Sequence, residues 1–281
     1  MTETADIVII GGGVNGASTA FHLARRGAGR IILLERASLA SGATGKSGAL
    51  VRCHYANRPE TELARLSLNT FSNWADEVGG DCGFRQVGAL ILTPESHRHE
   101  LEQNVRMQVS CGVNTSIISH AEALELDPEL TLSDVGGIAW EPDAGFADPQ
   151  ATTFAFAAAA ERHGAEIRLN SPALEILTEG DRVTGVRTEQ GVIHTGTVVL
   201  IAGARALQLL TPLGVSDFGL VPTATSVSIF SWAPGRSRHH PVYIDHVTNS
   251  WLRPYGDNAT LIGTELGAIS GIDPAAHPEL P

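Results

Sequence analysis

Three glycines and one glutamate near the start of the chain have the spacing of a dinucleotide-binding turn. Gly11, Gly13 and Gly16 form G-x-G-x-x-G, and Glu35 follows about 20 residues after the last of them. The first glycine bends the chain, the second lets a pyrophosphate approach the backbone, and the third lets a helix pack on the sheet. A carboxylate at this distance accepts hydrogen bonds from ribose hydroxyls and repels a 2′-phosphate. The four residues therefore predict binding of FAD or NAD rather than NADP.

This turn needs a strand before it and a helix after it. Residues 7–10 are apolar throughout, which indicates a buried strand. The helix begins with Val14 and Asn15 at the variable positions of the motif and ends at Gly27, and residues 31–34 form the next strand. Since strand, helix, second strand and acid are all present, the pattern favours a nucleotide-binding unit over an ordinary tight turn.

A run of small residues and glycines follows at residues 37–49. Its hydroxyls and backbone N–H groups suit a second stretch of the pyrophosphate and the edge of a flavin, although an ordinary loop has a similar composition. The next six residues, 50–55, contain arginine, cysteine, histidine and tyrosine, so several chemical groups follow the loop directly.

The order of glycine turn, small-residue loop and Arg-x-x-Tyr, from Arg52 to Tyr55, resembles the FAD-dependent amine oxidoreductases of the D-amino-acid oxidase superfamily. It is most similar to the sarcosine oxidase and dimethylglycine oxidase branch. The resemblance implies an FAD cofactor and a small amine or amino-acid substrate. It also implies oxidation of a C–N bond to an imine, with the electrons passed to oxygen or another acceptor.

The resemblance assigns candidate catalytic residues by position. Arg52 matches the residue that binds the substrate carboxylate, for which the guanidinium fork is suited, with a structural ion pair as the alternative. Tyr55 belongs to the same pattern, and His54 is a candidate by proximity. Trp251 falls where the family has an aromatic residue lining the pocket, and Glu265 where some relatives have a polar group.

The resemblance also extends the predicted FAD site beyond the turn. Backbone at Ala173 is expected to contact the adenine, and Ala202 and Gly203 end a buried strand beside the cofactor. Some relatives attach the flavin covalently, for which Cys53 or His54 is a candidate, but a buried unreactive thiol is favoured at Cys53. The predicted FAD-binding residues are Gly11, Gly13, Val14, Asn15, Gly16, Glu35, Arg36, Ala43, Thr44, Gly45, Lys46, Ser47, Ala173, Ala202 and Gly203.

These elements predict an α/β fold, in which a Rossmann-like FAD-binding domain is interleaved with an α+β substrate domain on a mixed, largely antiparallel sheet. The FAD-binding domain is expected to comprise residues 1–83 and 146–214, and the substrate domain residues 84–145 and 215–281. The pattern also predicts one amphipathic helix over residues 59–79, with Leu63, Leu66, Phe71, Trp74 and Val78 in the core.

Composition excludes several classes of partner. The formal net charge is −12, which argues against nucleic acid or an anionic membrane surface. The 3 cysteines have no metal or disulfide spacing, and His97 and His99 lie two residues apart on different helix faces, so no metal site is expected. No signal peptide or membrane-spanning run is recognised, and reduced thiols favour a cytoplasmic protein.

Family members continue beyond this pattern into a second glycine-rich flavin loop, which is absent before Pro281. A cut or incomplete polypeptide is the favoured explanation, and a partner subunit that supplies the rest is the alternative. For the assembly, a partner subunit or a homo-oligomer is left open. Two other functions stay open: an FAD-dependent monooxygenase, and a flavin-binding partial subunit that needs a partner.

Overall fold

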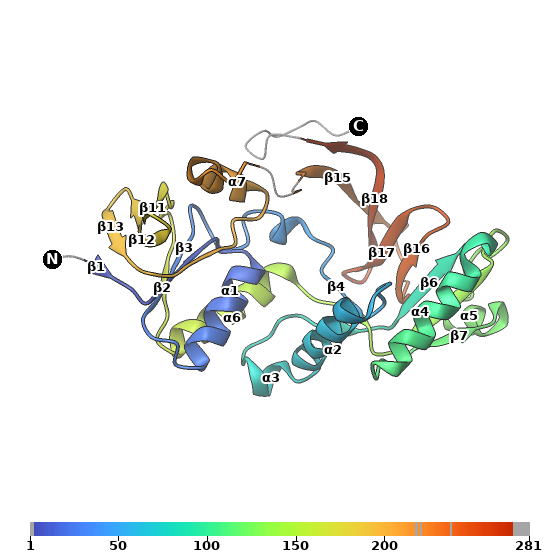
Figure 1. Ribbon diagram of the computed structural model, residues 1–281. Helices are drawn as coiled ribbons and strands as arrows, with labels where there is room; N and C mark the ends of the chain where they lie inside the picture. Colours follow the sequence, from blue (N-terminus) through green and yellow to red (C-terminus); the bar gives the residue numbers. More distant parts are fainter. Residues whose placement is uncertain (1–2, 217–218, 220, 237, 272–281) are drawn as a thin grey trace.

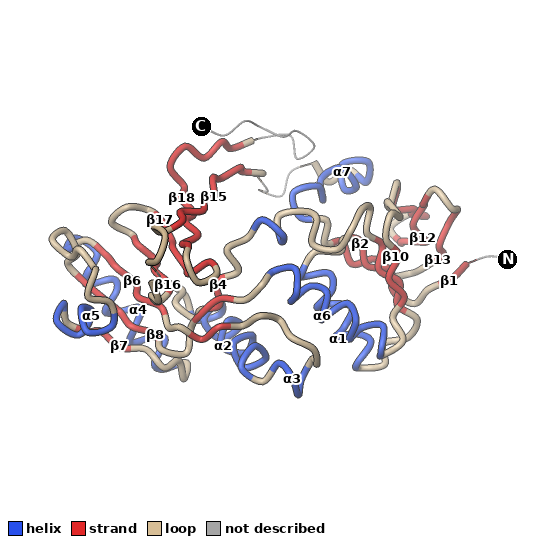
Figure 2. Tube along the Cα trace, turned by 180° about the vertical axis from the view of Figure 1, so that it is seen from behind, coloured by secondary structure: helices blue, strands red, loops and turns tan. Residues whose placement is uncertain are grey.

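The computed structural model describes residues 3–216, 219, 221–236 and 238–271. It has two lobes, one built on a four-stranded parallel sheet and one on a seven-stranded mixed sheet, joined by short elements (Figure 1). The view from behind shows the same two lobes with α2 and α3 between them (Figure 2). This arrangement confirms the predicted α/β class with a mixed second sheet. Within the described residues, no helix is long and apolar enough to cross a membrane.

The parallel sheet is buried on both faces. On one face, Ile9 and Leu33 pack against two neighbouring helices, and Phe21 contacts Phe156 there with ring centroids 5.6 Å apart. On the other face, Val8 and Ile32 pack against a second sheet. Burial on both sides explains why the strands are apolar at every position. In spatial order the strands are β10 (Glu166–Arg168), β3 (Ile31–Leu34), β2 (Ile7–Ile10) and β14 (Val198–Leu200), and the helices are α1 (Val14–Arg25) and α6 (Pro149–Arg162).

The second sheet of this lobe combines an antiparallel meander with one N-terminal strand. Ile176, Val186 and Ile193 turn toward the parallel sheet and close the core between the two sheets. The spatial order is β1 (Glu3–Thr4), β13 (Gly191–His194), β12 (Arg182–Thr188) and β11 (Glu175–Glu179).

The large sheet of the other lobe is antiparallel except where β16 and β6 run parallel. One helix covers it through Leu101 and Val105, and another packs through Ala123 on the opposite face. The spatial order is β15 (Thr223–Ser231), β18 (Ala259–Ser270), β17 (Ser250–Tyr255), β16 (Val242–Asp245), β6 (Ala89–Thr93), β8 (Gly137–Glu141) and β7 (Ser116–Ile118), and the helices are α4 (Arg98–Ser110) and α5 (His120–Leu126).

Short elements join the lobes. The chain leaves the parallel sheet for the large one, returns through α6, and leaves again toward β15. The domain limits given above remain a prediction. The connecting elements are β4 (Leu50–Val51), β9 (Gly145–Phe146) and β5 (Arg85–Gln86) in a three-stranded sheet, the helices α2 (Arg58–Ser72), α3 (Trp74–Glu77) and α7 (Ala206–Leu210), and the 3₁₀ turns η1 (Thr44–Lys46), η2 (Glu95–His97), η3 (Gly203–Arg205) and η4 (Thr211–Leu213).

The helix predicted over residues 59–79 is wrong in two respects. It is broken at Asn73, which ends α2 and precedes α3. Trp74 and Val78 are buried in the core, but Leu63 and Leu66 are 66% and 59% exposed. The apolar spacing of α2 predicts a core face, whereas the helix lies on the surface with Thr61 as its buried residue.

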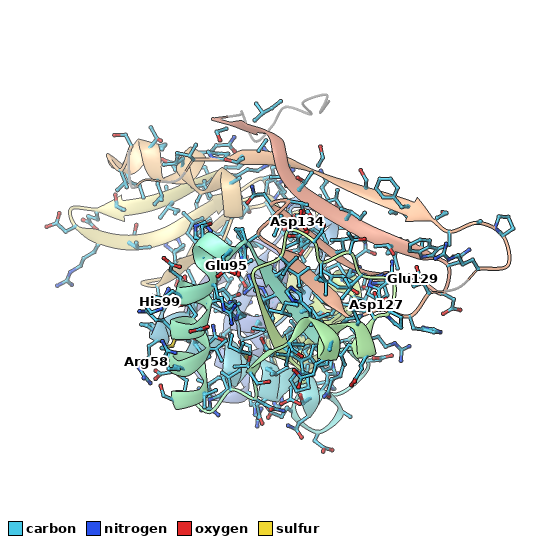
Figure 3. All side chains as sticks on the ribbon, turned by 90° about the vertical axis from the view of Figure 1, so that its right-hand side faces the viewer. Arg58, Glu95, His99, Asp127, Glu129 and Asp134 are labelled. Carbon is cyan, nitrogen blue, oxygen red and sulfur yellow. The ribbon has the colours of Figure 1, made fainter. Side chains whose placement is uncertain are left out.

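A polar cluster ties one end of the large sheet to the segment between β15 and β16. Asp127, which follows α5, is buried and accepts hydrogen bonds from Tyr243 and Arg238. Glu129 lies beside it (Figure 3) and pairs with Arg236 at 2.5 Å. Because Asp127 is 3% exposed, these bonds satisfy a carboxylate that would otherwise be costly to bury.

The contrast between buried and exposed apolar residues gives a stability test. Phe21→Ala removes a ring that is 1% exposed, and we expect it to lower the free energy of unfolding by about 3–5 kcal/mol. Leu63→Ala is the control and should change it by less than about 0.5 kcal/mol. Urea unfolding followed by far-UV circular dichroism measures both. A Leu63→Ala loss as large as that of Phe21→Ala would contradict the surface position of α2.

Candidate functional site

The glycine turn is closed by backbone packing that leaves no room for side chains. A Cβ atom on Gly16 would lie 1.8 Å from the Gly11 carbonyl oxygen, and one on Gly11 would lie 2.2 Å from the Ile201 oxygen. Gly11 also has a φ of +119°, which glycine adopts most readily. These contacts set α1 and the end of β14 directly against the end of β2, so Ala202 follows immediately beside the turn.

The N-terminus of α1 is open to an anion. Its N-cap is Gly13, which has no side chain, so the helix lacks a hydrogen bond from an N-cap side chain. The Val14 N–H group donates to Thr44 Oγ1 at 3.2 Å, which brings the small-residue loop against the first turn of the helix. Uncapped amides and the helix dipole together favour a negatively charged group at this position.

Glu35 lies at the end of β3 and faces the same turn. Its side chain is 8% exposed, Oε2 accepts from the Gly12 N–H group at 2.7 Å, and Oε1 accepts from the Ala37 N–H group at 2.9 Å. The carboxylate is therefore held by two backbone donors beside the turn. The Glu35 carbonyl accepts from Ser171 N at 2.9 Å, which places the segment leading to Ala173 nearby.

The other predicted FAD residues differ in exposure. Gly45 and Thr44 are half-buried in η1, and Gly203 begins η3 with a φ of +55°. The side chains of the remaining predicted residues of the turn and loop face solvent: Asn15, Arg36, Ala43, Lys46 and Ser47.

This donor set suits a dinucleotide. The turn offers backbone without Cβ atoms, an uncapped helix N-terminus and a carboxylate at the end of the adjacent strand, all at the carboxyl edge of a parallel sheet. A pyrophosphate needs the first two features and a ribose needs the third. The residues present therefore fit an FAD group.

Arg52, His54 and Tyr55 lie together in an irregular segment between β4 and α2. The Arg52 guanidinium donates to the His54 carbonyl and lies 4.5 Å from the centre of the Tyr55 ring. Arg52 is half-buried, and among the described residues it forms no ion pair. The alternative that Arg52 serves in a structural ion pair has no support in this part of the chain.

Burial controls the protonation of the two residues that follow Arg52. Burial, followed by the charges of Arg52 and His246, lowers the pKa of His54 to about 4, so the imidazole is neutral at pH 7. Burial, with the Glu141 carboxylate, raises the pKa of the Cys53 thiol to about 12. Cys53 is fully buried and stays a thiol, which makes it a poor nucleophile for attachment of a flavin.

Trp251 lies against the small-residue loop of residues 37–49. A Cβ atom on Gly48 would come within 2.3 Å of its indole, and one on Gly263 within 2.1 Å, so the ring is held between β18 and that loop. Glu265 belongs to β18, but its side chain lies outside the described part of the structure.

Arg253 is a further candidate that the sequence did not reveal. It is on the same face of β17 as Trp251, is 7% exposed, and lies 4.6 Å from the centre of the Phe146 ring. In the described part of the chain it forms no ion pair, and its Nε atom has no hydrogen-bond partner. The available signal was an arginine inside an otherwise apolar strand.

Two fully buried side chains contact the Arg52 segment from the large sheet and α4. Glu141 Oε1 accepts from the Cys53 N–H group at 2.6 Å, and Gln108 Nε2 donates to the Tyr55 carbonyl at 2.9 Å. Burial raises the pKa of Glu141 to about 7, despite the opposing hydrogen bonds from Cys53 and the charge of Arg52. Neither residue is among those predicted from the sequence.

No group of three or more His, Cys, Asp or Glu side chains that could hold a metal occurs within the described ranges. His99 lies on the outer side of α4 (Figure 3), where its ring contacts Gln103 at 2.8 Å.

The shifted pKa of Glu141 predicts a pH effect on stability. In the folded protein the carboxyl keeps its proton up to about pH 7, whereas an ordinary glutamate loses it near 4.5. The folded state therefore binds more protons than the unfolded state between these values, and this group lowers the free energy of unfolding as the pH rises through that window. His54, with a lowered pKa, acts in the opposite direction between about 4 and 6.5.

Glu141→Gln should remove the first contribution and leave the second. We expect the stability of the variant to rise more steeply than that of the unmodified protein between pH 4.5 and 7. Urea unfolding midpoints at several pH values measure the difference between the two. Parallel pH curves would contradict a buried, titrating Glu141.

Comparison with known proteins shows the family of the chain and several relatives. The family model "FAD dependent oxidoreductase" (DAO) matches residues 6–280. The chain is 34% identical over 209 residues to 4-methylaminobutanoate oxidase (formaldehyde-forming) of Paenarthrobacter nicotinovorans, which covers 74% of this chain and 25% of the relative. It is 31% identical to the mitochondrial sarcosine dehydrogenase of Homo sapiens, over 96% of this chain and 30% of the relative.

The fold is similar to that of L-proline dehydrogenase from P. horikoshii. The TM-score is 0.85 at 28% identity, covering 94% of this chain and 70% of that one. The chain thus spans well under two thirds of the length of the two curated relatives and most of the solved structure. On the family match over residues 6–280, the chain belongs to the FAD dependent oxidoreductases of the DAO family.

Proposed function

We propose that the protein uses FAD to oxidise the C–N bond of a small secondary amine that also carries a carboxylate. The relatives support this substrate class, because sarcosine, 4-methylaminobutanoate and L-proline each contain a secondary amine and a carboxylate. The substrate loses two electrons and two protons at the C–N bond, and water then hydrolyses the imine. FAD, when bound, accepts the electrons.

Arg52 carries the proposal. It is a half-buried guanidinium that has no carboxylate partner among the described residues and is steadied by the Tyr55 ring. A substrate carboxylate supplies the missing counter-charge and accepts two parallel hydrogen bonds from the guanidinium. Arg253 is a second candidate for the same carboxylate, because it is buried and forms no ion pair among the described residues.

The neighbouring residues suit this role. We propose that His54 is a neutral polar group behind Arg52, since its pKa of about 4 keeps it uncharged at pH 7. Trp251 is proposed as the aromatic wall of the pocket. Glu265 stays a candidate for binding the amine of the substrate.

For the cofactor, we propose that the glycine turn and the N-terminus of α1 hold the pyrophosphate and that Glu35 binds the ribose. The small-residue loop around Thr44 would continue along the cofactor. The free thiols of Cys53, Cys82 and Cys111 support a reducing compartment, and we propose the cytoplasm. A partner subunit or a second copy of the chain stays part of the proposal.

An anaerobic absorbance titration tests the reaction class. The purified yellow protein is titrated with sarcosine, dimethylglycine, 4-methylaminobutanoate, L-proline and D-amino acids, and the flavin band is followed. We expect bleaching by one class of carboxylate-bearing amine, and admission of air then separates an oxidase from a dehydrogenase. A flavin that no amine bleaches would contradict the proposal and favour a monooxygenase.

Arg52→Ala should separate substrate binding from cofactor binding. Losing a bidentate contact to a carboxylate should raise the KM by about 100-fold, with flavin content unchanged. Arg58→Ala is the matched control, because Arg58 is exposed and pairs with Glu62 on α2. For an amine substrate without a carboxylate, Arg52→Ala should leave the KM unchanged. Equal KM values for the two variants would remove Arg52 from the site.

Glu35→Ala should weaken FAD binding. The variant removes the carboxylate proposed for the ribose and leaves the Gly12 and Ala37 N–H groups without their acceptor. We expect the dissociation constant of FAD to rise by about 10-fold to 100-fold. Glu179→Ala, at the exposed end of β11, is the control. An unaltered constant, measured by quenching of flavin fluorescence, would count against the ribose assignment.

A further inference from the structure

The segment from Arg52 to Tyr55 belongs to neither a helix nor a strand, although it is largely buried. Buried backbone groups need hydrogen-bond partners, and in this segment side chains provide them. The Cys53 N–H group donates to Glu141, the Tyr55 carbonyl accepts from Gln108, and the His54 carbonyl accepts from Arg52 itself. The position of the Arg52 guanidinium is thus tied to the backbone of the two residues that follow it.

Of the two supporting side chains from other elements, Glu141 and Gln108, Glu141 binds the backbone group nearer to Arg52, the N–H of the next residue, Cys53. It ends β8, and it lies 88 residues from Cys53 in sequence, so the contact joins the large sheet to the segment that carries Arg52. The side chain has no exposed surface, and its Oε1 to Cys53 N distance of 2.6 Å is that of a strong bond. The other carboxyl oxygen, Oε2, has no hydrogen-bond partner among the described residues.

We propose that Glu141 is a positioning residue, which holds Arg52 in its carboxylate-binding place by accepting the hydrogen bond of the Cys53 N–H group. The role of Arg52 in this inference rests on the proposed function. Glu141 itself contacts the backbone next to Arg52 rather than the substrate. Loss of the acceptor leaves a buried N–H group unsatisfied, so the segment shifts to find another partner and takes Arg52 with it.

Three variants distinguish positioning from simple structural support. Glu141→Gln keeps an acceptor oxygen at the same reach, Glu141→Asp withdraws it by one methylene group, and Glu141→Leu removes it. We expect the KM for the carboxylate-bearing amine to rise about tenfold in the leucine variant and severalfold in the aspartate variant, and to stay near its normal value with glutamine. The kcat at saturation and the flavin content should change little.

Asp143→Asn is the matched control. Asp143 lines the same pocket as Glu141 and Cys53 and bonds to Gln86 at 3.3 Å, but it makes no hydrogen bond to the Arg52 segment in the described structure. It should leave the KM unchanged. The aspartate variant keeps both size and charge close to native, so the test remains decisive if the leucine variant does not fold.

A double-mutant cycle with Arg52→Ala completes the test. If Glu141 acts through Arg52, Glu141→Leu should add no further increase in KM once Arg52 is removed. An equal increase in both backgrounds, a normal KM in the aspartate and leucine variants, or a glutamine variant as impaired as leucine would overturn the proposal.

Acetate provides a readout that does not depend on turnover. Its dissociation constant, measured from the shift of the flavin absorbance band, should rise in Glu141→Leu by the same factor as the KM. If no amine bleaches the flavin but acetate binding weakens in this variant, the proposed reaction has failed and the positioning role stands. If an amine bleaches the flavin and all Glu141 variants bind acetate normally, the positioning role has failed and the reaction stands.

Discussion

The predicted cofactor site is built on close backbone packing at the glycine turn, where there is no room for a Cβ atom on Gly11 or Gly16. A side chain on Gly16 would collide with the Gly11 carbonyl, and a side chain on Gly11 would collide with the Ile201 carbonyl. The ends of β2, α1 and β14 therefore meet without side chains between them. Several features of the predicted cofactor site lie around that contact. It leaves the N-terminus of α1 uncapped, brings Glu35 within reach of the Gly12 N–H group, and lets Thr44 reach Val14. A pyrophosphate can approach only a surface built in this way.

The Arg52 segment is supported by a different kind of interaction. Its backbone is held by single side chains from β8 and α4, rather than by a strand ladder. Side-chain hydrogen-bond partners in a buried site give a defined geometry, because a backbone group that moves away from its partner is left unsatisfied. The position of Arg52 therefore depends on how the large sheet sits against the loop after β4. Trp251 of β17, held between Gly263 and Gly48, packs the large sheet against the small-residue loop that precedes β4.

Local patterns predicted what local physics determines. The glycine spacing and the apolar strands follow from backbone conformation and burial, and the structure has both. Burial of α2 could not be predicted in this way, since the spacing of Leu63 and Leu66 is the same on a surface helix as on a core one. Glu141, Gln108 and Arg253 were missed because their roles come from contacts across the fold. Glu141 binds Cys53, which lies 88 residues away in the sequence, and Gln108 binds Tyr55, which lies 53 residues away.

The charge distribution bears on the proposed recognition of a substrate carboxylate. The chain carries a formal net charge of −12, so its long-range field does not attract an anionic substrate. The attraction must come from groups at the site itself. His54 is neutral and Cys53 is a thiol at pH 7, so the Arg52 guanidinium is the positive charge of this segment, and Arg253 on β17 is a second guanidinium that is largely buried. A guanidinium that is removed from water without a counter-ion is costly, and an entering carboxylate offsets that cost. In the proposed function, selection for the carboxylate follows from an arginine whose counter-ion is left to the substrate.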